Sequence, residues 1–296
     1  MKSAPAALKV LSCSDSPDLA ARRRHELDIP RDRAAELARS ALEAAALGHY
    51  QNRRGETVDW SILVRQACSA KRSIAPDSLL PAFRSPLQPE TRVQVCNETT
   101  LQASHRLAQE GLRPLALNFA NGVTPGGGFL LGACAQEEVL CRSSALFCTL
   151  IDDPMYEYHR ARPRPDSSEW VIYSPDVPVF RSDDGAELDR PWLMSFVTSA
   201  APYAPAIGQP ESRDLLRKRI LRVLGVASAY GHLALVLGAW GCGAFANDPY
   251  HTALDFRSAL EADFRGHFSD VVFAITDWSH ERKYLGPFRD VFSAAS

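Results

Sequence analysis

The sequence predicts a three-layer α/β sandwich with a mixed, largely parallel sheet. Apolar runs typical of buried strands alternate with helical segments of 12 to 20 residues. The chain has 296 residues, 46% of them hydrophobic and 23% charged, which is enough for one large core. A net charge of −2 disfavours a protein that binds DNA through a strongly basic surface.

The first 30 residues have little apolar periodicity. Residues 1–30 predict a mobile lead-in, because Ser14–Pro17 favours a turn and Arg22–His25 form a solvated basic run. A basic arm that binds an anion is the alternative for this run.

Residues 31–90 predict a helical extension packed on the core. Apolar residues at spacings of three and four predict a helix from Asp32 to Gly48, where the glycine ends it. Residues 58–70 allow a short strand or a helix. Four prolines make the segment 74–90 irregular.

Residues 91–296 predict the main α/β core, in which strands and helices alternate. In chain order, strands are expected at 91–97, 114–119, 170–173, 194–199, 232–237 and 271–276. Helices are expected at 99–111, 137–150, 213–231, 250–268 and 281–292.

Cysteine content and hydropathy predict a cytoplasmic protein. No apolar run approaches the ~18 residues of a membrane span, and the N-terminus lacks a signal-peptide pattern. Seven cysteines without a Cys-x-x-Cys pair indicate a reducing compartment. Cys134, Cys141 and Cys148 are spaced by seven, which allows a zinc site, but no histidine accompanies them and core packing is favoured.

Two glycine-rich loops carry the chemistry, and each follows an expected buried strand. The first runs from Asn118 to Gly128 and leads to three polar residues, Gln136-Glu137-Glu138. The second spans residues 238–247. Glycine lets the backbone approach a ligand, and free N–H groups suit a phosphate. The two acids suit hydroxyl groups or a glycosidic bond. Together these features suggest a nucleotide-sugar ligand, while the motifs of kinases and dinucleotide-binding dehydrogenases are absent.

This pattern resembles the signature of the poly(ADP-ribose) glycohydrolases, in their compact microbial form. The resemblance lies in Gly126-Gly127-Gly128, seven intervening residues, and then Gln136-Glu137-Glu138. The second loop, from Gly238 to Phe245, is similar to that family's diphosphate-binding loop. The stretches 141–144 and 198–202 are similar too, so the resemblance extends in order over residues 91–280.

The resemblance implies a macrodomain fold and an exo-acting enzyme. The enzyme would hydrolyse the ribose–ribose O-glycosidic bond at the polymer end and release ADP-ribose. Glu138 would be the catalytic acid and Glu137 its ribose-binding partner. The other implied substrate-binding residues are Asn118, Asn121, Thr124, Gly126, Gly127, Gly128, Gln136, Gly241, Cys242, Gly243, Ala244, Phe245 and Thr276. Thr124 departs from the asparagine common in microbial members, and Asp277 is a further candidate at the adenosine end.

The expected partners are poly(ADP-ribose) or an ADP-ribosylated protein, with ADP-ribose as product. The resemblance implies no cofactor and no metal, and we expect a monomer with no membrane and no sequence-specific nucleic acid as partner. In the expected mechanism, Glu138 is protonated when substrate binds, because burial, Glu137 and the diphosphate raise its pKa. It then acts as base on a water molecule.

Two other functions remain open from the sequence. One is a module that binds ADP-ribose without turnover, although two adjacent acids argue against it. The other is a hydrolase that removes single ADP-ribose units. Trp240 is expected to brace its loop, Ser143-Ser144 fits no nucleophile motif, and residues 156–164 predict an exposed charged loop or, alternatively, a contact to a polyanion.

Overall fold

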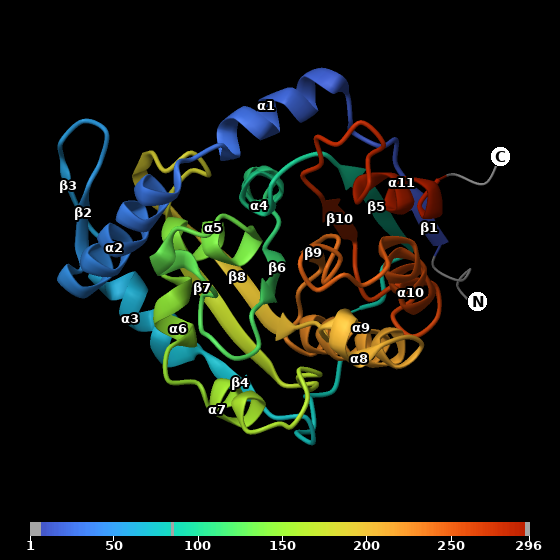
Figure 1. The fold of residues 1–296 in the computed structure, drawn as a ribbon. Helices are drawn as coiled ribbons and strands as arrows, with labels where there is room; N and C mark the ends of the chain where they lie inside the picture. Colours follow the sequence, from blue (N-terminus) through green and yellow to red (C-terminus); the bar gives the residue numbers. More distant parts are fainter. Residues whose placement is uncertain (1–6, 84–85, 294–296) are drawn as a thin grey trace.

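The computed structural model describes residues 7–83 and 86–293. At its centre lies an eight-stranded sheet in the order β1-β5-β10-β9-β6-β8-β7-β4 (Figure 1). Its strands are β1 (Ala7–Val10), β5 (Glu90–Cys96), β10 (Asp270–Ala274), β9 (Ala234–Leu237), β6 (Pro114–Ala120), β8 (Glu187–Ala200), β7 (Val171–Arg181) and β4 (Arg72–Ile74). Strand β7 pairs antiparallel with β8 and β4, and the other neighbouring pairs are parallel. The predicted mixed, largely parallel sheet is confirmed.

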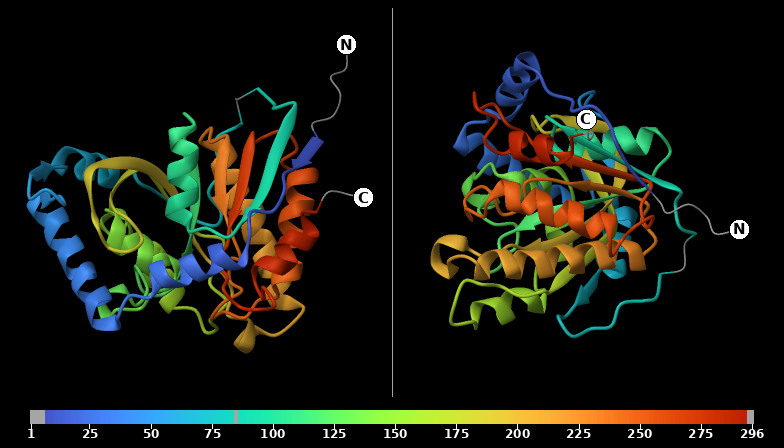
Figure 2. Two further views of the ribbon diagram at one scale, coloured as in Figure 1. Left: turned by 90° about the horizontal axis from the view of Figure 1, so that it is seen from above. Right: turned by 90° about the vertical axis from the view of Figure 1, so that its right-hand side faces the viewer.

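Helices cover both faces of the sheet, as Figure 2 shows. One hydrophobic core contains residues of α2 (Arg31–Leu47), α3 (Ser61–Ala70), α4 (Thr100–Gln109), α5 (Gln136–Ser143), α6 (Leu146–Leu150) and α7 (Pro154–Arg160). The other contains residues of α9 (Glu211–Ala229), α10 (Pro249–Glu261) and α11 (Leu285–Val291). Along β6, Ala116 faces the first core while Leu115 and Leu117 face the second. This alternation confirms the three-layer sandwich.

The described part of the expected lead-in contains two elements that the sequence analysis missed. Strand β1 pairs in parallel with β5, and α1 (Pro17–Leu27) begins where Ser16 Oγ accepts a hydrogen bond from the Leu19 N–H at 3.1 Å. The strand is short and partly exposed, and the helix is too polar to show a strong apolar stripe. Residues 1–6 lie outside the described residues.

The segment 31–90 contains the predicted helix as α2, which ends at Gly48 with φ +76°. The ambiguous stretch 58–70 divides into β3 (Thr57–Asp59), which pairs with β2 (His49–Gln51), and α3. Strand β4 joins the central sheet, so this extension supplies a strand as well as helices. The division of the chain at residue 90 stays a prediction.

Several elements of the core have other boundaries than expected. The helix expected over 137–150 breaks at Ser144, whose Oγ donates to the Leu140 carbonyl at 2.7 Å and accepts from the Leu146 N–H at 3.2 Å. Strands β7 and β8 are far longer than predicted, because Pro175 and Pro178 hide the alternation and β7 carries register shifts. Helix α10 stops at Glu261 instead of 268. In the described ranges, no helix has the length and hydropathy needed to cross a membrane.

Candidate active site

Helix α5 begins directly beside the end of β6, and the Gln136 side chain fixes it there. Its Oε1 accepts a hydrogen bond from the Phe119 N–H at 2.9 Å. Its Nε2 donates to the Leu117 carbonyl at 2.7 Å and to Thr100 Oγ1 at 3.1 Å. The amide is therefore occupied by the protein, and Gln136 orients the two glutamates that follow it.

The Glu137 carboxylate, on α5, is buried next to the C-terminal end of β6. Its Oε2 accepts a hydrogen bond from the Asn121 N–H at 2.7 Å, and its Oε1 accepts from Asn118 Nδ2 at 3.3 Å. Asn118 is itself fully buried and also donates to Thr198 Oγ1 at 3.2 Å. Burial, the largest cause, and the Glu138 charge raise the pKa of Glu137 to about 8, although the hydrogen bonds from Asn121 and Asn118 oppose this rise.

The Glu138 carboxylate faces the first glycine loop. Its Oε1 accepts a hydrogen bond from the Gly128 N–H at 3.0 Å, while Oε2 is buried and has no hydrogen-bond partner among the described residues. Gly127 adopts φ +58°, and a Cβ there would lie 2.4 Å from Glu138 Oε1 and 3.1 Å from Glu137 Oε2. Only glycine fits at this position, because any other residue would press on both carboxylates.

Hydrogen bonds between residues close in sequence, together with aromatic packing, shape the first loop. Asn121 Oδ1 accepts from the N–H groups of Val123 and Thr124 at 2.9 and 3.0 Å, which leaves Thr124 exposed at the rim. Behind Gly126 lie Phe129 and Phe147, which contact each other with ring centroids 4.8 Å apart. The sequence analysis missed this aromatic support.

His159 holds the neighbouring turn of this loop and was also missed. Its Nδ1 lies 3.0 Å from the Gly122 carbonyl, and its Nε2 lies 2.7 Å from Ser168 Oγ. Burial lowers its pKa to about 4, so the ring is neutral near pH 7. The sequence gives no indication of this role, because His159 on α7 is far along the chain from the loop that it contacts.

The second loop lies beside the first because β9 and β6 are neighbours in the sheet. Asn247 Nδ2 donates to the carbonyls of Pro202 at 2.9 Å and Gly241 at 3.2 Å, which fixes the loop. Trp240 is fully buried, as expected for a bracing residue. Among the described residues, no acceptor meets the N–H groups of Gly243, Ala244 and Phe245.

Cys242 was predicted to bind substrate as part of the second loop, and its side chain takes no part in this. Its thiol is buried and turned inward, 3.5 Å from the Trp240 carbonyl and 3.6 Å from Thr252 Oγ1. Only its backbone remains to face a ligand. Phe245, in contrast, is half-buried and meets Tyr203 edge-on at 5.9 Å.

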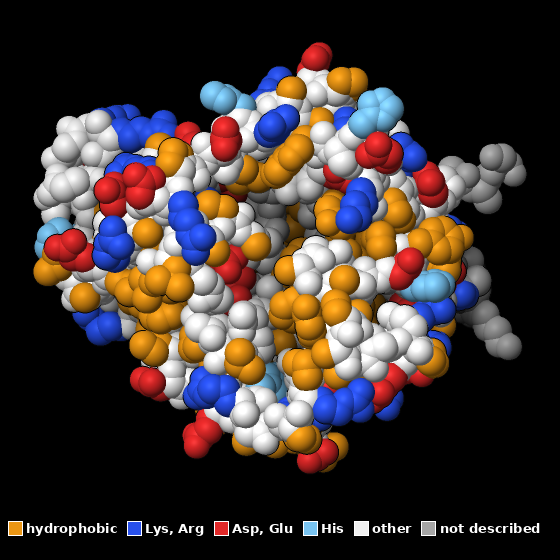
Figure 3. Space-filling model, viewed as in Figure 1, with side chains coloured by type: hydrophobic (Ala, Val, Ile, Leu, Met, Phe, Trp, Pro, Cys, Tyr) orange, Lys and Arg blue, Asp and Glu red, His pale blue; other side chains and the backbone are white. Residues whose placement is uncertain are grey.

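A cavity of about 470 Å³ adjoins both loops. Figure 3 shows this face hollowed, with acidic side chains on the floor. Among the predicted residues, Gln136, Gly243 and Thr276 line the cavity. The Asp277 carboxylate accepts hydrogen bonds from the N–H groups that begin α11, so its oxygens are engaged by the protein, and its expected place at the adenosine end stays a prediction. The lining residues that sequence reasoning missed include Thr100, Phe119, Trp278 and Tyr284.

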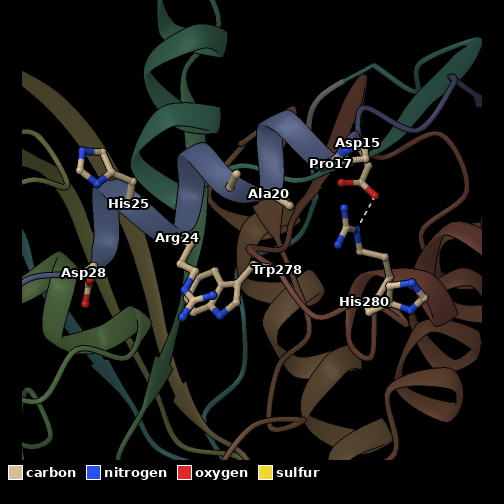
Figure 4. Close-up of a pocket in the computed structure, with 10 residues that line it drawn as sticks. Asp15, Pro17, Ala20, Arg24, His25, Asp28, Trp278 and His280 are labelled. Atoms are coloured by element: carbon tan, nitrogen blue, oxygen red, sulfur yellow. Dashed lines mark hydrogen bonds and ion pairs between the residues drawn. The ribbon is translucent and has the colours of Figure 1, made fainter.

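A second cavity, of about 750 Å³, lies between α1 and the segment after β10 (Figure 4). Arg24 and His25, from the basic run, line it together with Trp278 and His280. Trp278 lines both cavities, so α1 forms part of the rim near the first one.

Two sequence alternatives concerned metal and polyanion binding. Across residues 7–83 and 86–293, no group of three or more His, Cys, Asp or Glu side chains could hold a metal ion. In the segment 156–164, Arg162 pairs with Asp166 at 2.5 Å and Arg164 with Glu211 at 2.8 Å. These acids neutralise two of its cations. The expected exposed loop is wrong for the first part of the segment, because residues up to Arg160 belong to α7, in which Tyr156 and His159 are buried.

Comparisons with known proteins agree with this geometry. A family model described as the catalytic domain of microbial-type PARG matches residues 38–182. Poly(ADP-ribose) glycohydrolase from Thermomonospora curvata is 39% identical, with a TM-score of 0.82, over 87% of this chain and 98% of that one. Its complex with the inhibitor ADP-HPD is 40% identical over the same shares, with a TM-score of 0.81.

A solved structure from a second organism is also similar. Poly(ADP-ribose) glycohydrolase from Deinococcus radiodurans in complex with ADP-ribose is 39% identical, with a TM-score of 0.71, over 77% of this chain and 96% of that one. No curated protein matches the chain.

Proposed function

The chain belongs to the microbial-type poly(ADP-ribose) glycohydrolase family, and we propose that it hydrolyses the ribose–ribose O-glycosidic bond at the end of a poly(ADP-ribose) chain and releases ADP-ribose. The observation that carries the proposal is the buried carboxylate pair facing Gly127, since a glycosidic bond needs a positioned acid. Binding alone does not need two adjacent buried acids, whose charges oppose folding.

We propose that the leaving oxygen receives its proton from Glu138. Oε1 is held by the Gly128 N–H, which leaves the unpartnered Oε2 to meet the substrate. Burial and the neighbouring Glu138 raise the pKa of Glu137 to about 8, so the carboxyl group beside Glu138 holds a proton near neutral pH. Glu138 donates the proton to the glycosidic oxygen, which departs as a ribose hydroxyl group.

After bond cleavage, Glu138 acts as the base. Its carboxylate takes a proton from the attacking water, which adds to the oxocarbenium-like anomeric carbon. Glu137 remains fixed by Asn121 and Asn118 and holds the ribose hydroxyls. This scheme uses carboxylates alone, so turnover in a chelating buffer should equal turnover in a standard one.

The remaining substrate is placed by the two loops and the cavity between them. The N–H groups of Gly243, Ala244 and Phe245 are available for the diphosphate. Phe245 packs on the terminal ribose, and Thr276 lies at the adenosine end of the 470 Å³ cavity. We propose further that the protein acts as a cytoplasmic monomer.

One experiment tests the function. Purified protein is incubated with poly(ADP-ribose) and, separately, with a mono-ADP-ribosylated target, and free ADP-ribose is measured for wild type and Glu138→Gln. We expect release from the polymer, reduced by about 10²-fold or more in the variant, with ADP-ribose affinity retained. Release only from the mono-modified target would make the chain a mono-ADP-ribosyl hydrolase. Tight binding without release would make it a binding module.

A further inference from the structure

His159 lies outside both glycine loops, yet it contacts the turn on which Glu137 depends. The Asn121 N–H donates to Glu137 Oε2 at 2.7 Å, and the carbonyl of the next residue, Gly122, lies 3.0 Å from His159 Nδ1. A carbonyl oxygen only accepts, so Nδ1 carries the ring proton and donates it to this bond. His159 therefore fixes the backbone directly after the residue that bonds to Glu137.

The other ring nitrogen connects His159 to the segment between α7 and β7. Nε2 carries no proton in the neutral ring, so it accepts a hydrogen bond from Ser168 Oγ at 2.7 Å. Ser168 Oγ in turn accepts from the Trp170 N–H at 3.2 Å, so the hydroxyl group is held on both sides. A Cβ on Gly122 would lie 2.5 Å from Ser167 Oγ, so the turn also packs directly on this segment.

The same segment contacts the second glycine loop. The Pro165 carbonyl accepts a hydrogen bond from the Tyr203 N–H at 3.1 Å, and the Ala204 N–H donates to the Phe245 carbonyl at 3.0 Å. Tyr203 and Phe245 also meet edge-on, with ring centroids 5.9 Å apart. The contacts that begin at His159 therefore end at the ring that is proposed to pack on the terminal ribose.

A buried arginine supports this segment from the other side. Arg219, on α9, is fully buried and donates hydrogen bonds to the carbonyls of Ala200, at 3.0 Å, and Asp166. These two bonds join the end of β8 to the segment that His159 contacts. The segment is therefore a fixed base between the two loops.

We propose that His159 is a positioning residue for the proposed reaction, because its two hydrogen bonds fix the first glycine loop relative to the second. This role rests on the proposed function, in which the two loops hold different parts of one substrate. Glu137 and Glu138 contact the first loop, whereas the N–H groups proposed to hold the diphosphate belong to the second. A change in the separation of the loops would move the ribose away from Glu138, and a misplacement of about 1 Å can reduce the rate by about 10²-fold.

Three substitutions at His159 test this role. We expect His159→Ala to lower kcat by about 10- to 100-fold and to raise KM by less than about threefold, because the cavity lining stays in place. Asparagine places an amide N–H where Nδ1 lies, so His159→Asn should restore kcat to within about threefold of wild type. Glutamine places its amide near Nε2 instead, so the kcat of His159→Gln should stay close to that of His159→Ala.

His232 provides a matched control at the opposite end of the sheet. It is buried like His159 and also contacts one carbonyl and one hydroxyl group. Its Nδ1 lies 3.3 Å from the Arg113 carbonyl, and its Nε2 lies 2.8 Å from the Tyr173 hydroxyl. Arg113 precedes β6, whereas the first loop follows it. His232→Ala should lower the denaturant midpoint as much as His159→Ala does and keep the wild-type kcat.

Hydrogen exchange of backbone amides gives a readout that does not depend on turnover. Peptides that cover residues 118–128 and 238–247 should exchange faster in His159→Ala than in wild type, His159→Asn or His232→Ala. If His159→Ala does not fold, Ser168→Ala replaces it, because this variant removes the bond to Nε2 and keeps the ring. We expect Ser168→Ala to lower kcat by about threefold or more and to exchange faster in the same peptides.

Three results would overturn the proposal. They are a wild-type kcat in folded His159→Ala or, in its place, Ser168→Ala; a His159→Asn variant as slow as His159→Ala; and an equal loss of kcat in His232→Ala. If wild type released no ADP-ribose from the polymer, the proposed function would fail, and with it the role of His159 in turnover. The exchange readout would still show whether His159 connects the two loops.

Discussion

Glu137 and Glu138 are adjacent in the chain, yet the protein holds their carboxylates differently. Both oxygens of Glu137 accept hydrogen bonds, from Asn121 and Asn118, whereas Glu138 Oε2 is buried without one. The sequence could indicate the pair from its place at a predicted helix start. It could not indicate the division of tasks, because that depends on which N–H groups the folded loop presents.

The raised pKa of Glu137 predicts a pH dependence of stability. The folded pKa is about 8 against a usual 4.5, so between these values the native state holds a proton that the unfolded state has lost. Stability should therefore fall as pH rises from 4.5 to 8, by at most about 1.4 kcal/mol per pH unit. In Glu137→Gln this dependence should disappear, as measured by the free energy of unfolding at pH 5, 6.5 and 8. The exposed Glu43→Gln is the control, and a constant difference between wild type and Glu137→Gln at all pH values would contradict the assignment.

The backbone conformation at Gly127 predicts that a single methyl group there lowers both turnover and stability. An alanine there would have to adopt φ +58° and would place its Cβ against Glu138 Oε1. Gly127→Ala should reduce kcat by about 10²-fold or more and the free energy of unfolding by about 1–3 kcal/mol. Gly286→Ala is the matched control, since its Cβ would meet only ordinary contacts at 3.5 Å or beyond. Steady-state kinetics and denaturant unfolding measure both effects, and wild-type kinetics for Gly127→Ala would show that the loop adapts.

At the scale of elements, the sequence predicted most core strands and helices but not their partners. Buried strands such as β6 and β9 are visible as apolar runs, and the glycine loops that follow them are visible by composition. The break between α5 and α6 was not, because it depends on Ser144 bonding to its own helix and on a bridge to Val179 in β7. The length of strand β7 was underestimated. Its prolines interrupt the alternating pattern, and the full strand is recognisable only from its pairing with β8.

Phe245 in the second loop should contribute more to catalysis than to the free energy of unfolding. Phe245 is half-buried, and its ring packs at the edge of the second core and against Tyr203. Phe245→Ala should lower kcat/KM by about tenfold or more while reducing the free energy of unfolding by about 1 kcal/mol. Phe264→Ala, at an equally half-buried position of the same core, should lose similar stability and keep its turnover. If Phe245→Ala unfolds instead, Phe245 belongs mainly to the core.

At the scale of the whole molecule, the two ends of the described chain meet beside the proposed adenosine site. Asp15, just before α1, pairs with Arg282, just before α11, at 2.7 Å, and also accepts a hydrogen bond from Asn97 at 2.8 Å. Asn97 in turn donates to the Asp277 carbonyl at 2.7 Å. The sequence could not indicate this junction, because it joins residues separated by most of the chain. The junction holds α1 close to Trp278, the residue that lines both cavities.

This junction predicts that the interaction energy between Asp15 and Arg282 is larger than that of an exposed surface ion pair. The Asp15 and Arg282 side chains are each 14% exposed, whereas the exposed pair Arg113–Asp176 lies 3.4 Å apart in solvent. A double-mutant cycle with Asp15→Ala and Arg282→Ala should give an interaction energy of about 1–3 kcal/mol in the free energy of unfolding. The same cycle at Arg113 and Asp176 should give about 0–1 kcal/mol. Because α1 and Trp278 border the cavity, both single variants should also bind ADP-ribose more weakly by calorimetry. Equal coupling at the two pairs, with unchanged ADP-ribose affinity, would mean that the N-terminal segment lies on the core without supporting the site.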